Sequence, residues 1–300
     1  MRISVVIATY NRARFLAGLY RSVTEQTLPS QAYEVLFIDN NCTDETPGMV
    51  AFYKQQNPAV RYIKETQQGL SYARNRGIAE AQAPYICFAD DDALLDKEYL
   101  EKVCDYLDAH PNVYEVGGPI LLHYTGVIPA WDNPYMNSLL GYFYPSPQGY
   151  VLTGKNKRYP RGSNMVFRKA AFDQCGLFST DLGRKGTLLL GGEEKDMAYR
   201  LLDHRLDVAY IPDAVVYHLV PPERTTEDYI RRQALGTGAG ERHRTRAIKA
   251  EYPKRLGKEA VKWAATLVLW VKYMITLKPA KANMLVKFRF WVTKGLTTDL

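Results

Sequence analysis

Three adjacent aspartates, Asp90, Asp91 and Asp92, end an apolar run in the segment YICFADDDALL (85–95). Adjacent carboxylates repel one another, so at the mouth of a buried element they need a cation or a raised pKa. Carboxylate oxygens favour Mg²⁺ or Mn²⁺, which keep several waters and take one or two protein carboxylates. The cluster therefore predicts a divalent cation that joins the protein to an anionic ligand such as a diphosphate.

Short apolar runs that alternate with helical patterns must position these aspartates. The predicted strands are 3–9, 34–40, 60–65 and 85–89. The predicted helices lie within 15–26, 45–56, 70–82 and 100–107. The alternation indicates βαβ units, and the continuous apolar strands predict an α/β fold with a mostly parallel, Rossmann-like sheet flanked by helices on both faces.

Two further polar segments follow strands of this predicted sheet. ATYNR (8–12) comes after the first strand, and DNNCTDET (39–46) comes after the second. Ligands of open α/β sheets bind beyond the carboxyl ends of the strands, where the aspartates also lie. This arrangement fits a nucleotide whose base lies over the first strands and whose diphosphate is bridged to carboxylates by the metal. The sequence has no GxxxxGK[ST] or GxGxxG motif, so the metal would replace a glycine-rich loop as the diphosphate anchor.

Six segments occur in the order typical of one enzyme family. They are SVVIATYNR, EVLFIDNNCTDET, GLSYARNRGI, ICFADDD, RGSNMVFRKAAFDQCGLF and GGEEKDMAYRL. Over about residues 1–225 the chain resembles family 2 glycosyltransferases with the GT-A fold. The resemblance implies a catalytic domain of 1–225, with a donor-binding half of about 1–122 and an acceptor-side half of about 123–225.

The resemblance also implies an activity. It is the inverting, metal-dependent transfer of a sugar from a nucleotide-diphosphate sugar, UDP-linked in our prediction, in polysaccharide or glycan assembly. The acceptor would be a saccharide or a lipid-linked saccharide, and the cofactor would be Mn²⁺ or Mg²⁺. An alternative of another class is a nucleotide-sugar-binding or scaffold protein without catalysis. Prenyl diphosphate chemistry is disfavoured because its aspartate-rich motifs belong to all-helical folds.

The resemblance gives each polar segment a role toward the donor. The residues that would line the nucleotide pocket are Thr9, Tyr10, Asn11 and Arg12. Asp39 would accept a hydrogen bond from a uracil-like base, and Arg74 would contact the donor. Asp90 and Asp91 would also contact the donor, with Asp90 nearer the ribose. Asp92 would be nearest the metal, with His218 as a second ligand, because neutral imidazole commonly binds metals.

Several of these residues also have a purely structural interpretation. Asp39 and Asp44 are residue types that form Asx turns and cap helices. The aspartates at 91 and 92 could cap a helix in a solvated loop. Arg74 could stabilise a helix surface, and His218 could be a histidine whose hydrogen bonds are satisfied at the sheet edge.

The general base of an inverting transfer is expected in the segment GGEEKD (191–196). Relatives usually carry Glu-Asp in this block, and the position of the catalytic Asp corresponds here to Glu194. The two glycines, Gly191 and Gly192, would let the backbone approach the donor. The positive end of the helix that follows would favour a carboxylate. We predict Glu194 as the base, with Asp196 and Glu193 as alternatives.

The positive charge of the chain is concentrated at its C-terminal end. Residues 221–300 contain 17 Lys and Arg against 7 Asp and Glu, and 226–300 is predicted as a basic helical extension. Its longest uncharged apolar run has nine residues (263–271), against the ~20 needed to cross a bilayer. Trp and Phe beside Lys and Arg indicate helices that lie on an anionic membrane surface through 246–296. The alternative is an amphipathic helix docked on the catalytic core.

The cysteines and the N-terminal segment indicate the cellular compartment in which the protein is expected. The four cysteines form no CxxC pair and lie in apolar patterns, which is typical of reduced core thiols. The N-terminal segment does not resemble a secretory signal. We therefore expect a cytoplasmic protein, with a peripheral position on the cytoplasmic face of the membrane if the C-terminal helices bind lipid. No nucleic-acid partner is expected.

Overall fold

A computed structural model describes residues 1–156, 158–184, 192–246 and 251–298. By its internal contacts the chain divides into two compact units. The first, which we call the catalytic unit, comprises Met1–Leu121 and Phe143–His218. The second, which we call the helical unit, comprises Leu122–Tyr142 and Leu219–Leu300. Each unit is built around its own hydrophobic core.

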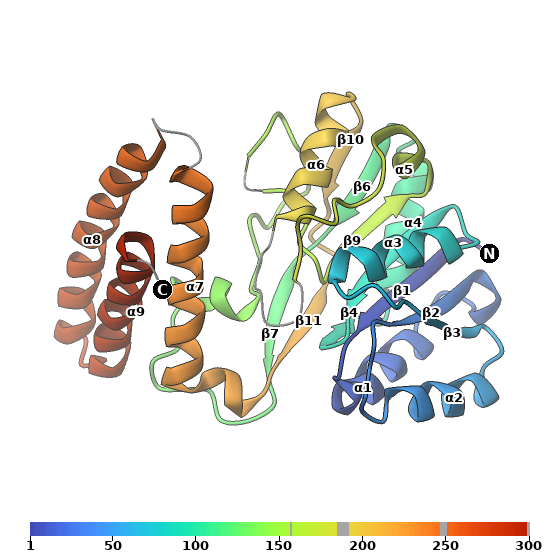
Figure 1. Ribbon diagram of the computed structural model, residues 1–300, viewed down its shortest axis with the longest axis horizontal. Helices are drawn as coiled ribbons and strands as arrows, with labels where there is room; N and C mark the ends of the chain where they lie inside the picture. The colour runs from blue at the N-terminus through green and yellow to red at the C-terminus, as the bar shows by residue number, and fades with distance from the viewer. Residues whose placement is uncertain (157, 185–191, 247–250, 299–300) are drawn as a thin grey trace. The chain divides into compact units, whose positions relative to one another are not determined.

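A mostly parallel sheet forms the centre of the catalytic unit (Figure 1). Its strands are β1 (Ile3–Thr9), β2 (Tyr33–Asp39), β3 (Val60–Lys64), β4 (Tyr85–Asp90), β6 (Val113–Gly117), β8 (Tyr150–Val151), β9 (Met165–Arg168) and β10 (Asp207–Tyr210). Their order is β3-β2-β1-β4-β9-β6-β10-β8. Strands β1 to β4 pair in parallel, whereas β9 is antiparallel to both β4 and β6. The predicted strands and their parallel arrangement are confirmed.

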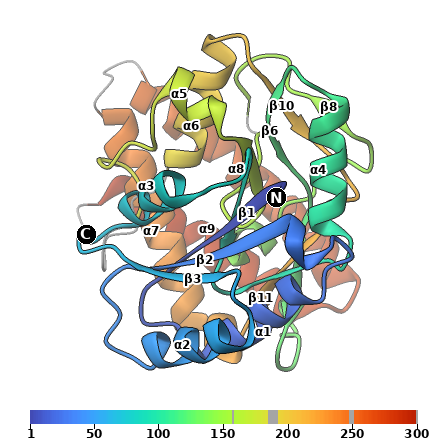
Figure 2. The ribbon, with the colours of Figure 1, turned by 90° about the vertical axis from the view of Figure 1, so that its right-hand side faces the viewer.

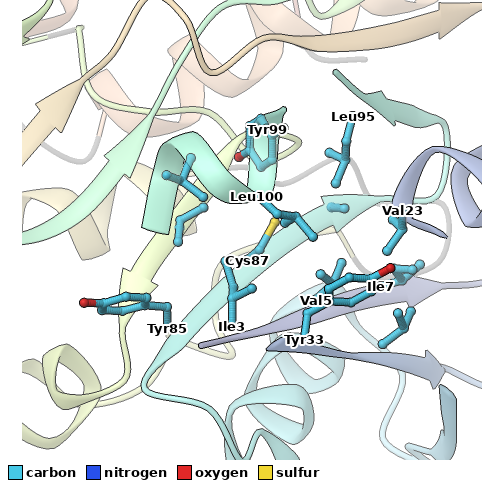
Figure 3. Packing of buried hydrophobic residues seen from close by; sticks show 14 of the residues in the cluster. Ile3, Val5, Ile7, Val23, Tyr33, Tyr85, Cys87, Leu95, Tyr99 and Leu100 are labelled. Atoms are coloured by element: carbon cyan, nitrogen blue, oxygen red, sulfur yellow. The ribbon is translucent and has the colours of Figure 1, made fainter. Parts of the chain in front are cut away.

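Helices cover both faces of this sheet, because its strands are apolar on both sides. The helices are α1 (Ala13–Thr24), α2 (Thr46–Gln56), α3 (Leu70–Glu80), α4 (Tyr99–Ala109), α5 (Ala170–Cys175) and α6 (Glu193–Asp203). Strands β1 to β3 run between α1 and α2 on one side and α3 on the other (Figure 2). On the first side, Ile3, Val5 and Ile7 join one core cluster with residues of α1, α2 and α4 (Figure 3). On the second side, residues of α3, α5 and α6 join a second core cluster that includes Val6 and Leu36.

The strand register brings polar residues from different segments to one edge. In the parallel pairing of β1 with β2, Thr9 lies opposite Asp39, and in the pairing of β1 with β4, Ala8 lies opposite Asp90. A second sheet has the order β5-β11-β7, with β5 (Ala93–Leu95), β11 (Val216–Val220) and β7 (Ile120–Tyr124). His218 of β11 pairs with Ala93 of β5, directly after Asp92. Strand pairing thus places His218 beside the aspartate cluster.

Three long helices dominate the helical unit: α7 (Glu227–Arg246), α8 (Glu251–Ile275) and α9 (Pro279–Thr297). Two glycines allow α7 and α9 to approach closely. A Cβ on Gly238 would lie 2.1 Å from the carbonyl oxygen of Val292, and one on Gly295 would lie 2.2 Å from that of Leu235. Any larger residue at either position would push the two backbones apart.

The compact units do not follow the predicted division at residue 225. Residues 122–142, expected in the acceptor-side half, belong to the helical unit. Met136 and Leu140 pack there with Ile230 of α7 and Phe288 of α9, and this apolar burial accounts for the difference. The functional division into 1–225 and 226–300 stays a prediction. Within the residues described, no helix combines the length and hydropathy needed to cross a membrane.

Candidate active site

The aspartates after β4 are held by side chains from the first turn of the sheet. Arg12 Nε lies 3.0 Å from Asp91 Oδ1, and Arg12 Nη2 pairs with Asp92 Oδ2. Thr9, at the end of β1, donates a hydrogen bond from Oγ1 to Asp91 Oδ2 at 3.0 Å. The sequence predicted a divalent cation for this cluster, and in the protein itself Arg12 supplies one positive charge to two of its carboxylates.

Asp91 is buried at the base of this cluster and has a raised pKa. The pKa of Asp91 is raised to about 7, chiefly by burial and also by the nearby charges of Asp92 and Asp90. The charge of Arg12 and the hydroxyl of Thr9 oppose the shift. A second cation that approaches this cluster would favour the ionised form of Asp91.

Asp92 and His218 form the pair that could hold a divalent ion. His218 Nε2 lies 3.4 Å from Asp92 Oδ1, and both side chains are almost fully buried. Adjacent ligands of an octahedral ion are about 3 Å apart when each is about 2.1 Å from the metal. No group of three or more His, Cys, Asp or Glu residues suited to a metal occurs in the described part of the chain. The pair therefore fits an ion that takes its other ligands from a diphosphate and water.

The two turns predicted to bind the nucleotide are locked together by side-chain contacts. Asn11 adopts a left-handed conformation with φ 53°, and its Oδ1 accepts a hydrogen bond from the Thr43 amide at 2.7 Å. Asp39 is buried, accepts a hydrogen bond from the Cys42 amide at 2.6 Å and accepts a second from the Tyr62 hydroxyl. Tyr10 is 43% exposed, so its ring is accessible to a ligand.

Asp44 has a structural role. Its Oδ2 accepts a hydrogen bond from the Ala13 amide at the start of α1 at 2.9 Å, and its Oδ1 accepts one from the Thr46 amide of α2 at 3.1 Å. One carboxylate therefore caps two helices, in agreement with the helix-cap interpretation. Beside it, an open cleft of about 760 Å³ is lined by Asn11, Arg12, Ala13, Arg14, Thr43, Asp44, Glu45 and Met49.

Arg74 lies at the centre of a second charged cluster, which we call the Arg74 cluster: Arg74, Asp90, Glu193 and Glu194. Arg74 Nη1 donates to Glu193 Oε1 at 2.9 Å. Arg74 Nη2 lies 3.6 Å from Asp90 Oδ1 and 3.9 Å from Glu194 Oε1. The side chain of Arg74 is only 2% exposed and packs over the ring of Phe178. Arg74 is therefore not a surface residue of α3, as its alternative interpretation required.

The three carboxylates that could act as the base have different surroundings. Glu194 is 24% exposed, whereas Glu193 is 5% exposed and hydrogen-bonded to Arg74. Asp196 forms an ion pair with Arg200 at 2.9 Å, outside the Arg74 cluster. Burial and the charge of Glu193 raise the pKa of Glu194 to about 7, and Asp90 adds to this shift. The charges of Arg74 and Arg161 oppose it.

Two residues of this region had no role in the sequence analysis. A Cβ on Gly162 would lie 2.3 Å from Glu194 Oε1 and 2.9 Å from Arg74 Nη2, so the absence of a side chain there makes room for both groups. Glu115 of β6 is fully buried, and neither of its carboxylate oxygens has a hydrogen-bond partner among the described residues. Burial, and then the charge of Glu194, raise the pKa of Glu115 well above its usual range. A charged residue within the apolar run of β6 was the available signal.

The structure thus brings the predicted residues of the catalytic unit into two adjoining clusters. Thr9, Arg12, Asp91, Asp92 and His218 form the first, and the Arg74 cluster forms the second, with Asp90 next to Asp91 in sequence. Asp39 lies beside Thr9 through the strand register. Gly191 of the predicted base segment lies outside the described residues.

Comparisons with known proteins agree with this fold. A glucosyl-dolichyl phosphate glucuronosyltransferase of Haloferax volcanii is 24% identical over 247 residues, which cover 81% of this chain and 77% of that protein. The poly(ribitol-phosphate) beta-N-acetylglucosaminyltransferase TarS of Staphylococcus aureus is 29% identical over 111 residues, which cover 37% of this chain and 19% of that protein.

A solved structure shares the fold over almost the whole chain. It is a mannosyltransferase from Pyrobaculum calidifontis in complex with GDP-Man and Mn²⁺, with a TM-score of 0.63 and 21% sequence identity. The match covers 99% of this chain and 87% of that one, and it confirms the predicted fold class. The family model described as glycosyl transferase family 2 matches residues 4–176, more than half of the sequence. The chain therefore belongs to glycosyl transferase family 2 and is a glycosyltransferase.

Proposed function

We propose that the protein transfers a sugar with inversion from a UDP-linked donor to a saccharide or lipid-linked saccharide in glycan assembly. The observation that carries the proposal is the Arg74 cluster. Arg74 Nη2 lies between Asp90, 3.6 Å away, and Glu194, 3.9 Å away. A donor-binding carboxylate and a candidate base thus flank one buried guanidinium. A donor bound at Asp90 would bring its sugar toward an acceptor hydroxyl held by Glu194.

The chemistry that we assign to Glu194 is general-base catalysis. As the acceptor oxygen forms its bond to the anomeric carbon, Glu194 takes the hydroxyl proton, and the bond to the diphosphate breaks with its electron pair on the departing oxygen. A pKa of about 7 suits this role, because the group is then partly ionised near neutral pH and still basic enough to accept a proton. Such assistance is worth roughly a hundred- to ten-thousandfold in rate.

Asp92 and His218 would hold the divalent cation, Mn²⁺ or Mg²⁺. When bound, the ion would neutralise the charge that develops on the departing diphosphate. Their separation of 3.4 Å fits two ligands of one ion, and the mannosyltransferase from Pyrobaculum calidifontis was determined with Mn²⁺. In our proposal Arg12 holds Asp91 and orients Asp92 through charge-assisted hydrogen bonds.

On the donor side, Thr9, Tyr10, Asn11 and Asp39 would form the base and ribose site. Asp39 already accepts hydrogen bonds from Cys42 and Tyr62, which would fix its orientation toward the N–H group of a uracil-like base. A carboxylate has about four lone-pair sites, so it could accept this further hydrogen bond. The choice of uracil rests on the resemblance to family 2 glycosyltransferases, in which the Asp after the second strand reads the base.

A panel of nucleotide sugars tests the proposal. The full-length protein would be incubated with UDP-, GDP- and dTDP-linked sugars and Mn²⁺, and the released nucleotide would be measured. We expect UDP release that stops with EDTA and returns with Mn²⁺. Release of another nucleotide would replace the UDP assignment and leave the transferase assignment intact. A protein that binds a nucleotide sugar but never releases its nucleotide, with any acceptor in the panel, would favour the alternative of an inactive nucleotide-sugar-binding or scaffold protein.

A further inference from the structure

Helix α8 has an outward face that is apolar, and the residues that it buries most deeply are polar, although Leu269 and Tyr273 also pack inward. The residues of α8 that are buried are Arg255, Glu259 and Thr266. Aliphatic side chains face outward instead: Val261 is 70% exposed, Val268 69%, Val271 48% and Ile275 76%. Spacings of seven, three and four residues place these four side chains on one side of the helix. We call Val261, Val268, Val271 and Ile275 the α8 stripe.

The buried charged residues of α8 form ion pairs with α7 and α9, and these contacts fix the orientation of α8. Arg255 Nη1 donates to Glu259 Oε2 at 2.7 Å, and Arg255 Nε donates to Glu241 of α7 at 3.0 Å. Glu259 Oε1 accepts a hydrogen bond from Arg289 of α9 at 2.9 Å. Rotation of α8 to bury the stripe would strip these charges of their partners, which is strongly unfavourable. The outward orientation of the α8 stripe is therefore stabilised by the ion pairs of the helical unit.

Basic residues border the stripe. Lys254, Lys258 and Lys272 are exposed, and Lys258 and Lys272 lie within one helical turn of Val261 and Val268 respectively. From residue 252 to residue 298 the chain has ten Lys and Arg and a single acidic residue, Glu259, which is buried. Positive charge is thus in excess on the exposed surface around the stripe, although Glu251 lies in the first turn of α8 and Lys287 of α9 is paired with Glu227 of α7.

We propose that the outward face of α8 docks on an anionic lipid membrane, with the α8 stripe in the interfacial layer and the bordering lysines on lipid phosphates. An aliphatic face flanked by cations is the composition of a helix that lies in the plane of a membrane surface. A protein partner fits less well, because lysine is depleted from protein–protein interfaces. The proposal deepens the proposed function. It rests on that function only for the reason why the enzyme would bind a membrane, which is that a lipid-linked acceptor would be found there.

Vesicle flotation tests the proposal with full-length protein. We expect the protein to float with vesicles that contain phosphatidylglycerol and to stay behind with phosphatidylcholine alone. Replacing Val261, Val268 and Ile275 with Ser should weaken the binding on the order of a hundredfold, because each loses apolar contact with the lipid. The matched control replaces three exposed aliphatic residues elsewhere with Ser: Val127, Ile128 and Leu177. The control should bind as the parent does.

A second variant separates the charge from the apolar contact. Replacing Lys254, Lys258 and Lys272 with Gln should also weaken binding roughly a hundredfold, since each lysine near an anionic surface contributes about fivefold. The loss should shrink at high salt, where the parent itself binds less. Equal flotation of the parent and both variants would overturn the proposal, as would equal binding to neutral and anionic vesicles.

The remaining outcomes concern another occupant of the face and the independence of the test. A parent that ignores vesicles but is dimeric by light scattering, and becomes monomeric in the Ser variant, would assign the stripe to a second copy of the chain and overturn the lipid proposal. Flotation requires no turnover, whereas nucleotide release is measured without lipid. A negative flotation result therefore leaves the nucleotide-release test of the proposed function valid, and a negative nucleotide-release result leaves the flotation test valid.

Discussion

Arg74 and Glu193 form an ion pair inside the catalytic unit, with Nη1 and Oε1 2.9 Å apart and the two side chains 2% and 5% exposed. Because this contact fixes one side of the guanidinium, its other nitrogen faces Asp90 and Glu194. Glu193 thus orients Arg74, and Arg74 sets the charge that Glu194 experiences. The pair links helix α3 to helix α6, and its two residues are 119 positions apart in sequence.

Replacing Arg74 with Met should move the acid limb of the pH profile for transfer to higher pH. The positive charge of Arg74 lowers the pKa of Glu194, so its removal leaves burial and the charges of Glu193 and Asp90 less opposed. Loss of one partner of the buried pair should also cost roughly 3–5 kcal/mol of folding stability. Arg76→Met, on the same helix but in an exposed ion pair with Glu80, is the matched control and should change neither quantity appreciably. An unshifted profile would contradict this account.

The rate of transfer by the parent enzyme should rise as the pH increases through about 7, because Glu194, whose pKa lies near that value, must be ionised to accept a proton. Glu194→Gln should lower the rate at least about a hundredfold and keep donor affinity. Initial rates and nucleotide-sugar binding would be compared with those of Asp196→Asn, whose carboxylate pairs with Arg200. Near-normal turnover in Glu194→Gln, with loss in Asp196→Asn, would move the base to Asp196.

Gly162→Ala should impair transfer while the fold persists. The added Cβ would lie 2.3 Å from Glu194 Oε1, so the carboxylate at the end of that flexible side chain would have to move away. Displacement of a reacting group by about 1 Å costs roughly a hundredfold in rate. The control is Gly48→Ala in α2, where an added Cβ meets nothing within 4 Å. Full activity in Gly162→Ala would show that Glu194 has room to adjust.

Glu115→Gln should make the protein relatively more stable as the pH rises. The pKa of Glu115 is raised by burial, so the folded state favours the protonated side chain. The stability associated with this proton is fully present below the unfolded pKa of about 4.3 and is lost as the pH rises toward the folded pKa. Gln carries no titrating proton, so the difference between variant and parent should grow as the pH rises above the unfolded pKa of about 4.3. Urea unfolding at several pH values measures it. Glu25→Gln, at an exposed site, is the control, and a difference independent of pH would contradict the prediction.

Asp92→Ala should lower the transfer rate on the order of a thousandfold, because the variant loses a ligand of the ion that stabilises the departing diphosphate. Mn²⁺ titration of activity and of metal binding would separate weaker binding from slower chemistry. The matched change is Asp203→Ala, which removes an exposed carboxylate paired with Lys155. If the parent were fully active in EDTA, or if Asp92→Ala kept full activity, the proposed role of the metal would be wrong.

Much of the fold followed from local pattern alone. The apolar runs near 3–9, 34–40, 60–65 and 85–89 became β1 to β4 with boundaries shifted by one residue at most. For β1, β2 and β4 the reason is that a strand buried on both faces leaves a continuous apolar signal, whereas β3 lies at the edge of the sheet and is partly exposed. The position of the polar turns beyond these strands followed as well, since parallel strands end at the same edge. The roles assigned to the individual site residues stay predictions.

Tertiary structure decided what local pattern leaves open. The sequence of α3 does not reveal that Arg74 is buried, because that depends on two glutamates carried by α6. The need for Gly162 depends likewise on a carboxylate that approaches from another element. In α8 the sequence predicts an amphipathic helix, but which face turns inward was settled by the ion pairs that Arg255 and Glu259 make with α7 and α9. Sequence periodicity fixes which residues share a face, whereas only the contacts with other elements determine what that face meets.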